Sequence, residues 1–586
     1  MSKKIHFLLF FFLCLASIPL VAQNIEVKGV VTEATTNEPL PGVTVKVKGK
    51  DTGTVTNMDG KYTVKANKGD ILVFSTIGMK SIEHTISSNA PINVSMEEDN
   101  VALEQVVVIG YGTAKKSHLS GAVSSVGAKE LNGAVATNAG TALQGKIAGV
   151  SVTSTSGDPN EGMTINVRGI SSLSSNDPLY VIDGSFGDLS MVDPSDIASI
   201  EVLKDAAASS IYGSRAPFGV VLITTKKGKA GKVNINYNNS FRWSEAINLP
   251  DVADAYTYAM YFNKMQLNDG KTAVQFDDTR LQAIKDYASG TITTTTQPNR
   301  NTPTIWDWIG NTNTDWYDVV FGGTAFSQEH SLSVSGGTEK IQYYFSGNYM
   351  GQEGMMAIRR DKLQRYSVSS KINAQLYPWL NMNYSMKYMR KDYSKPTAMT
   401  DNTLYQNIAK RWPMEPTVDP NGYPMGNTII RPILYGGDNN SQTDWLYQQF
   451  QVVIEPIKDW KIFGEINYKV IDAFTHTDYL KVPQMNVAGE PYSGDTWKTS
   501  KVTEGAERTN YFNANVYSEY YRSFADAHHL KAMVGFQAEV NKWRQLQASK
   551  LDLISESVPS INAATGESTI DKSKLTHWAT AGFFGR

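Results

Sequence analysis

The residues that could do chemistry in this chain are few and lie far apart. Eight histidines are scattered along 586 residues, and His528 and His529 follow Asp526 in a segment typical of a solvated turn rather than a metal site. The G-x-S-x-G nucleophile motif and the P-loop are absent, and residues 184–187 (GSFG) lack the spacing and the following helix of a dinucleotide fingerprint. We therefore predict no catalytic residue, no metal ligand and no cofactor, and a protein that is not an enzyme.

Asp193 and Asp196 are the best candidates for a pair of catalytic carboxylates. Asp193 precedes Pro194, and an aspartate directly before a proline is typical of the start of a helix. We therefore interpret both aspartates as capping residues. A glycoside hydrolase stays open as an alternative, because it needs two facing carboxylates on a concave site and β-sandwich modules often accompany such enzymes.

These two aspartates belong to a stretch, Asp183 to Thr225, around which the chain is organised. Its pattern predicts a helix, a strand, a second helix and a second strand. In order, these are a helix beginning at Pro194, a strand over Ser199–Lys204, an Ala-rich helix capped by Asp205 and ending at Gly213, and a β-branched strand over Val220–Thr225. Gly213 is free to take the left-handed conformation in which helices often end.

Composition limits the class of protein. The chain is too long for one ordinary domain, and its charged fraction of 19% with a net charge of -2 argues against binding to nucleic acid. Aromatic residues make up 10% of the chain and glycine contributes 46 residues, which favours abundant β-structure. The mean hydropathy of -0.31 excludes a bundle of membrane helices.

The N-terminus is typical of an export signal. Lys3 and Lys4 precede a short apolar run, Phe7–Leu15, and Ala22 is a small residue at the expected cleavage site. We predict a signal peptide over residues 1–22, with an uncleaved anchor as the alternative. The single cysteine, Cys14, lies inside this signal, so the mature chain is expected to fold without disulfides.

Residues 23–98 predict a small β-sandwich. Val43, Val45 and Val47 alternate with polar residues, and residues 52–64 predict a hairpin with an Asp59-Gly60 turn, which we prefer to a calcium loop. The segments Pro39-Leu40-Pro41-Gly42-Val43-Thr44-Val45 and Gly60-Lys61-Tyr62 resemble the carboxypeptidase-regulatory-like family. That resemblance implies a non-catalytic module.

The next two segments carry the most specific resemblance. Residues 99–114 hold an extended apolar run that is either the last strand of the sandwich or a tether captured by strand addition. Residues 115–228 contain Leu143-Gln144-Gly145-Lys146-Ile147-Ala148-Gly149-Val150, Pro178-Leu179-Tyr180-Val181-Ile182-Asp183-Gly184 and Ile200-Glu201-Val202-Leu203-Lys204-Asp205, which resemble the plug of SusC-like TonB-dependent outer-membrane transporters. The resemblance places a TonB box, the partner-binding segment, at Glu104, Gln105, Val106, Val107, Val108, Ile109 and Gly110.

Residues 229–586 show the alternation of a barrel wall. Val233, Ile235 and Tyr237 alternate with asparagines, short turns such as 336–339 recur on one rim, and long polar connections such as 391–445 lie on the other. Soluble β-rich repeats are the alternative. Trp306, Trp308 and Trp316 favour an interfacial girdle over sugar stacking. The strands supply about half of a 22-stranded barrel, so we expect a longer functional protein.

The predicted fold class is therefore mainly β: a carboxypeptidase-regulatory-like β-sandwich, an α+β plug domain and a partial transmembrane antiparallel β-barrel. The plug must sit in a polar lumen, so we expect its charged residues to contact the barrel wall through weak, solvated ion pairs. The predicted plug–barrel contacts are Arg168, Glu201, Lys204, Asp205 and Arg215.

The resemblance also implies a function. It implies TonB-dependent import of oligosaccharides, or less often peptides, across the bacterial outer membrane. The implied partners are a TonB-type periplasmic energy-transducing protein, a SusD-like surface lipoprotein and outer-membrane lipid. The alternative is a passive outer-membrane adhesin or structural barrel without active transport.

Overall fold

The computed structural model describes most of the chain. The described residues are 25–34, 38–50, 52–76, 79–88, 90–97, 106–108, 113–115, 123–132, 139–154, 157–169, 177–205, 209–400, 404–425, 429–492, 498–524 and 528–585. The predicted signal peptide and Glu104, Gln105, Ile109 and Gly110 lie outside them. The chain divides into two compact units, of which the first holds an N-terminal sandwich and the second a plug and a large sheet.

The N-terminal unit is a two-layer β-sandwich, as predicted. One sheet has the order β4-β1-β7 and the other the order β3-β2-β5-β6. Their interior is lined by fully buried side chains such as Val27, Val45 and Phe74. The strands are β1 (Ile25–Glu33), β2 (Thr44–Val47), β3 (Gly53–Val55), β4 (Lys61–Ala66), β5 (Ile71–Ser75), β6 (Ile82–Thr85) and β7 (Val94–Met96).

The predicted hairpin over residues 52–64 is wrong, because β3 and β4 belong to different sheets. The Asn57 side chain accepts hydrogen bonds from the backbone N–H groups of Asp59 and Lys61, 3.1 and 2.9 Å away, and turns the chain from one sheet to the other. Gly60 has φ 69°, and a Cβ there would lie 2.5 Å from the carbonyl oxygen of Val31. The Asp-Gly signal therefore marks a crossing between layers.

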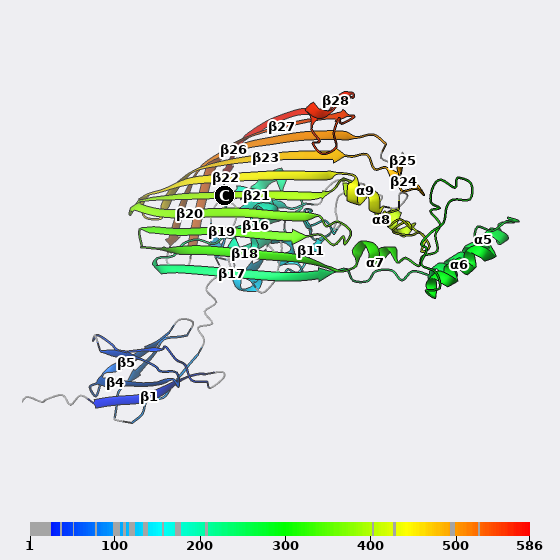
Figure 1. Cartoon of the computed structure of the whole chain (residues 1–586). Helices are drawn as coiled ribbons and strands as arrows, with labels where there is room; N and C mark the ends of the chain where they lie inside the picture. Colours follow the sequence, from blue (N-terminus) through cyan, green and yellow to red (C-terminus); the bar gives the residue numbers. More distant parts are fainter. Residues whose placement is uncertain are drawn as a thin grey trace, which may run out of the picture. The chain divides into compact units, whose positions relative to one another are not determined.

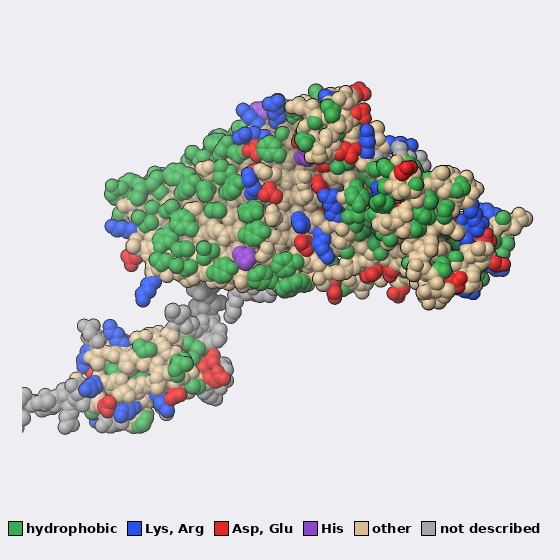
Figure 2. Space-filling view, in the orientation of Figure 1, with side chains coloured by type: hydrophobic (Ala, Val, Ile, Leu, Met, Phe, Trp, Pro, Cys, Tyr) green, Lys and Arg blue, Asp and Glu red, His purple; other side chains and the backbone are tan. Residues whose placement is uncertain are grey.

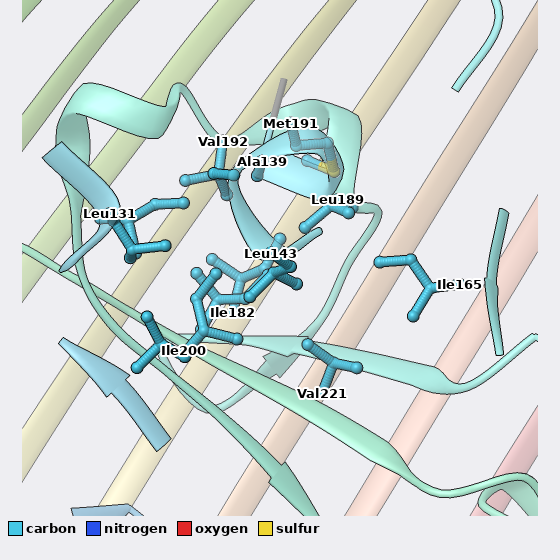
Figure 3. Packing of buried hydrophobic residues seen from close by; sticks show 14 of the residues in the cluster. Leu131, Ala139, Leu143, Ile165, Ile182, Leu189, Met191, Val192, Ile200 and Val221 are labelled. Atoms are coloured by element: carbon cyan, nitrogen blue, oxygen red, sulfur yellow. The ribbon is translucent and has the colours of Figure 1, made fainter. Parts of the chain in front are cut away.

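The plug combines a five-stranded sheet of order β10-β15-β16-β13-β14 with a two-stranded sheet, β11-β12. Its short helices and strands enclose one apolar core, shown in Figure 3. The strands are β10 (Val123–Gly127), β11 (Val150–Thr153), β12 (Thr164–Val167), β13 (Leu179–Ile182), β14 (Ser185–Phe186), β15 (Ile197–Leu203) and β16 (Val220–Thr225). The helices are α2 (Ala128–Asn132), α3 (Ala139–Leu143), η2 (Leu189–Met191), η3 (Pro194–Asp196) and η4 (Ser210–Arg215).

The predicted helix–strand–helix–strand unit appears as η3, β15, η4 and β16. Asp193 caps η3 by accepting a hydrogen bond from the Ser195 N–H at 3.0 Å, as predicted. The second helix differs from the prediction, since its described part is a 3-10 helix that continues to Arg215 through a kink at Gly213. Gly213 has φ 61° and ψ -146°, a conformation that is accessible essentially to glycine alone.

The large sheet contains ten antiparallel strands paired in chain order, as Figure 1 shows. Many residues facing the plug are small or polar and buried, such as Ser331 and Asn467, whereas apolar residues such as Ile235 and Val368 are exposed on the opposite face. The predicted alternation of a barrel wall is therefore confirmed. The strands are β17 (Gly231–Glu245), β18 (Thr324–Gly337), β19 (Ile341–Glu353), β20 (Lys362–Tyr377), β21 (Leu380–Pro396), β22 (Asp438–Ile457), β23 (Trp460–Tyr479), β26 (Lys501–Phe524), β27 (His528–Leu551) and β28 (Ser568–Gly585).

The long connections lie on one rim and carry their own helices. They contain α5 (Ala255–Asn268), α6 (Asp278–Ala288), α7 (Trp316–Phe321), η5 (Thr397–Thr400), α8 (Leu404–Ala409), α9 (Ile430–Tyr435), β24 (Gln484–Met485), β25 (Pro491–Tyr492) and η6 (Ile561–Ala563). Trp316 is only 2% exposed, and its indole N–H donates to the carbonyl of Trp412. The interpretation of Trp316 as an interfacial girdle residue is therefore wrong, because it builds the core of a loop.

Every helix in the described part of the chain is too short or too polar to cross a membrane.

Candidate functional site

The plug is fixed to the barrel sheet by acidic residues at the ends of its strands. Asp183 follows β13, and its carboxylate lies 2.8 Å from the ammonium nitrogen of Lys371 and 2.7 Å from that of Lys387. It also accepts hydrogen bonds from the backbone and the hydroxyl of Thr225. Burial alone would raise the pKa of Asp183, but the two ammonium groups outweigh burial and hold this pKa well below its usual range.

The barrel strands place the two lysines side by side. Lys371 of β20 pairs in register with Ser385 of β21, so Lys387 lies two residues further along the neighbouring strand. Residues two apart on a strand point to the same face, which brings both lysines to the plug side. The hairpin between β20 and β21 therefore builds a cationic clamp for one carboxylate.

Asp193 and Asp196 make a second set of contacts with the same sheet. The side chains of Asp193 and Arg365, only 1% and 8% exposed, form an ion pair of 2.9 Å. Asp196 accepts hydrogen bonds from four residues of β19 and β20: Tyr344 at 2.8 Å, Ser346 at 2.8 Å, Ser369 at 3.0 Å and Asn348 at 3.3 Å. Burial and the neighbouring charge of Asp193 nevertheless raise the pKa of Asp196.

Arg215 anchors the plug at a separate point. It forms an ion pair with Glu539 of β27, and its guanidinium group lies 5.2 Å from the ring centre of Phe186 and 5.1 Å from that of Trp578. Tyr511 donates a hydrogen bond of 2.7 Å to Glu539 as well. One cation thus connects η4 of the plug to β26, β27 and β28 of the sheet.

The other predicted contact residues lie within the plug. Arg168, whose side chain is 52% exposed, forms an ion pair with Asp205, and Lys204 donates to the hydroxyl of Ser124 and to the carbonyl of Ala148. Glu201 lies on β15, which is paired on both sides by β10 and β16, and is 3% exposed. Burial raises the pKa of Glu201 to about 7.

The sequence did not predict an anchoring role for Asp183, Asp193, Asp196, Arg365, Lys371 and Lys387, although Asp193 and Asp196 were expected as helix caps. A signal existed: on the plug-facing positions of β20 and β21, where serine and asparagine are the most frequent uncharged residues, several residues are cationic. The ion pairs of these residues are buried, unlike the weak, solvated pairs expected for the predicted contact residues. Removing one partner of a buried pair leaves the other charge uncompensated, which costs about 3–5 kcal/mol.

The segment predicted to bind a periplasmic partner is described only at its centre. Val106–Val108 forms β8, which pairs with β9 (Thr113–Lys115) in a two-stranded sheet. A strand this short has exchangeable backbone hydrogen bonds, because a competing strand can offer the same pattern. Its role as a TonB box stays a prediction.

A polar cavity of about 340 Å³ lies against the sheet toward the long connections. Gln545 and Gln547 of its lining share the face of β27 that Glu539 presents to the plug. Hydroxyl, amide and carboxylate groups dominate its wall, at Asn439, Thr475, Thr477, Glu507, Gln545 and Gln547. Such groups can hydrogen-bond a neutral polar ligand.

Comparisons with known families agree with this architecture. Residues 115–220 match the TonB-dependent Receptor Plug Domain, and residues 27–108 match the CarboxypepD_reg-like domain. The chain is 38% identical over 386 residues to "TonB-dependent receptor SusC" from Bacteroides thetaiotaomicron, a match that covers 64% of this chain and 34% of that protein. It is 29% identical over 554 residues to "TonB-dependent receptor P39" from Formosa agariphila, covering 91% of this chain and 48% of that protein.

Solved structures show the same fold. The structure of the "RagAB peptide transporter" aligns with a TM-score of 0.67 at 24% identity, covering 80% of this chain and 53% of that chain. The "open-open" state of the RagAB peptide importer aligns with a TM-score of 0.66 over 82% of this chain and 54% of that chain.

A plug seated against an outward-apolar antiparallel sheet, with a carboxypeptidase-regulatory-like module earlier in the chain, is the arrangement of TonB-dependent receptors of the outer membrane. The chain is similar to the SusC-like branch of these receptors, and it spans about a third of the length, 34%, of the SusC protein that it matches. The predicted resemblance to SusC-like TonB-dependent transporters, the predicted fold class and the predicted outer-membrane location are confirmed. The relatives are named as receptors, in agreement with the prediction that the chain is not an enzyme.

Proposed function

We propose that this chain is part of a TonB-dependent importer that carries oligosaccharides or peptides across the outer membrane. The observation that carries the proposal is the seated plug, which is held at Asp183, Asp193 and Asp196 by cationic and hydroxyl groups of the barrel sheet. A plug that closes a lumen and rests on defined ionic contacts has to be displaced before a solute can pass. Import therefore needs an energy source and a segment through which a partner protein can pull on the plug.

The proposed partner-binding segment runs from Glu104 to Gly110, directly before the plug in the chain. Within it, β8 already adopts the extended conformation that strand addition requires, and it holds only a short local partner, β9. A TonB-type periplasmic protein would replace β9 and pull on the plug through main-chain hydrogen bonds. The extracellular partner would be a SusD-like surface lipoprotein that delivers the substrate.

The substrate class is supported by the polar cavity on the plug-facing side of the sheet. Neutral amide and hydroxyl groups such as Asn439, Thr475 and Gln545 suit the hydroxyl groups of a sugar or the backbone of a peptide. The proposed domain order is signal peptide (1–22), sandwich (23–98), tether (99–114), plug (115–228) and the N-terminal part of the barrel (229–586).

The test is a deletion of Val106 to Ile109 in cells that depend on this protein for growth on one glycan or peptide, identified by a growth panel. Uptake should fall to the level of cells without the protein, while the amount of protein at the surface stays constant. A matched control deletes residues 116–119, which lie beyond the tether. Unchanged uptake in the Val106 to Ile109 deletion would support a passive adhesin or structural barrel instead.

A further inference from the structure

The outer face of the sheet carries a cationic cluster at the edge of its apolar band. Glu539 of β27 points toward the plug, because it pairs with Arg215, so the even-numbered residues of β27 face outward. The outward positions are apolar from the short turn onward, at Leu530, Ala532, Val534, Phe536, Ala538 and Val540. The next two outward residues are Lys542 and Arg544.

The length of this apolar run identifies its depth in the membrane. Ten residues separate Leu530 from Val540, which is about 33 Å along the strand at about 3.3 Å per residue. Because barrel strands are tilted by about 40° from the membrane normal, this length spans about 25 Å across the membrane. That distance equals the height of the apolar band of an outer-membrane barrel. Lys542 and Arg544 therefore lie at the level of the lipid headgroups on the side of the long loops.

Neighbouring strands add to the same cluster. Arg508 of β26 pairs in register with Arg544, and His577 of β28 pairs in register with Lys542. Like charges directly opposite each other on a sheet repel, so this arrangement is unfavourable without an anion between them. Figure 2 shows the green apolar side chains at the short-turn end of the sheet and basic side chains gathered over β27 beside them.

Acidic neighbours compensate only part of this charge. Asp472 of β23 lies 3.6 Å from Arg508, whose side chain is still 59% exposed. In the described part of the chain, neither Lys542 nor Arg544 forms an ion pair, and both are exposed. By contrast, Arg390 on the same outer face is matched by Asp444, which accepts hydrogen bonds of 2.8 and 3.0 Å from it.

We propose that Arg508, Lys542 and Arg544 form a binding site for the phosphate group of an anionic lipid in the outer leaflet. The two guanidinium groups and the ammonium group present several N–H donors around one exposed position, and guanidinium groups match the geometry of phosphate oxygens. A phosphate at this level offsets the repulsion between Arg508 and Arg544.

The test uses the whole protein reconstituted in phosphatidylcholine vesicles, with spin-labelled phosphatidic acid as the probe and spin-labelled phosphatidylcholine as the reference lipid. Electron spin resonance gives the fraction of each lipid that is immobilised by the protein. The wild-type protein should prefer phosphatidic acid. Arg544→Gln and Lys542→Gln should each lower that preference about fivefold, the effect expected for one cation near an anionic headgroup.

The matched control is Lys550→Gln, which removes a cation from the same face of β27 about 20 Å further along the strand. It should leave the preference unchanged. Equal losses in Arg544→Gln and Lys550→Gln would overturn the proposal, because they would report general surface charge. Loss of the preference in 20 mM inorganic phosphate would also overturn it, because the site would then bind the free ion.

Discussion

Replacing Asp183 by asparagine tests how the plug is held. The substitution keeps the shape of the side chain and removes the charge that Lys371 and Lys387 share at 2.8 and 2.7 Å. The side chains of Asp183 and Lys387 are each only 8% exposed, so solvent cannot replace the lost anion fully. We expect a cost near the lower end of the range for broken buried pairs, about 3 kcal/mol.

A cost of this size shifts the balance between a seated and a displaced plug by about a hundredfold. Cells that produce Asp183→Asn should therefore become sensitive to a large glycopeptide antibiotic that the outer membrane normally excludes, with normal amounts of protein at the surface. Amide hydrogen exchange of β13 and β16 in the purified protein should accelerate by a similar factor.

Two variants sharpen this test. Arg168→Gln is the matched control, because its exposed ion pair with Asp205 lies within the plug and should contribute about 0–1 kcal/mol. The double variant Asp183→Asn with Lys387→Met removes one of the two stranded cations and should recover part of the loss. Antibiotic exclusion and exchange rates in Asp183→Asn that equal those of the wild type would refute the reasoning.

Three further predictions follow from the plug. Burial raises the pKa of Glu201 to about 7, so the folded plug keeps a proton that the unfolded chain releases above about pH 4.3. The stability of the plug should therefore fall as the pH rises from about 4.5 to 7, and then level off. Thermal unfolding of Glu201→Gln should not show this fall. Gly213→Val should destabilise the plug by about 1–3 kcal/mol, because the φ of 61° and ψ of -146° at position 213 strain any residue other than glycine. The control Gly127→Ala, which has open space at the Cβ position, should cost less in the same unfolding assay. Arg215→Gln should admit more antibiotic than Arg168→Gln does, because it leaves Glu539 buried without its cation, and equal sensitivity of the two strains would contradict this.

The sheet could be predicted from the sequence because its signal is local. Apolar and polar residues alternate along each strand, as in Val233 to Asn238, and the two faces of one strand meet lipid and plug. The sequence signal for the helix η3 is equally local, because Asp193 and Pro194 alone define the start of this helix. Short turns then pair neighbouring strands such as β20 with β21 and β22 with β23, whereas long connections join others, such as β21 and β22.

The cations on β20 and β21 left a signal in the sequence, but their pairing with plug carboxylates could not be predicted, because each anchor joins residues more than a hundred positions apart. Asp183 finds its cations about two hundred residues later, at Lys371 and Lys387, and the plug sequence alone gives no sign of them. Counting charges selected exposed residues such as Arg168, which serve the plug itself. Asp193 shows the limit most clearly, because one carboxylate oxygen caps a helix and the other binds Arg365.

The central claim is that this receptor imports its substrate by energy delivered through β8, and a single substitution tests it most directly. Val107→Pro removes one backbone donor and blocks strand addition, whereas Val107→Ile keeps both the donor and the β-preference. Uptake of the radiolabelled growth substrate should fall to background in Val107→Pro and stay normal in Val107→Ile, with equal surface amounts. Normal uptake in Val107→Pro would contradict the account.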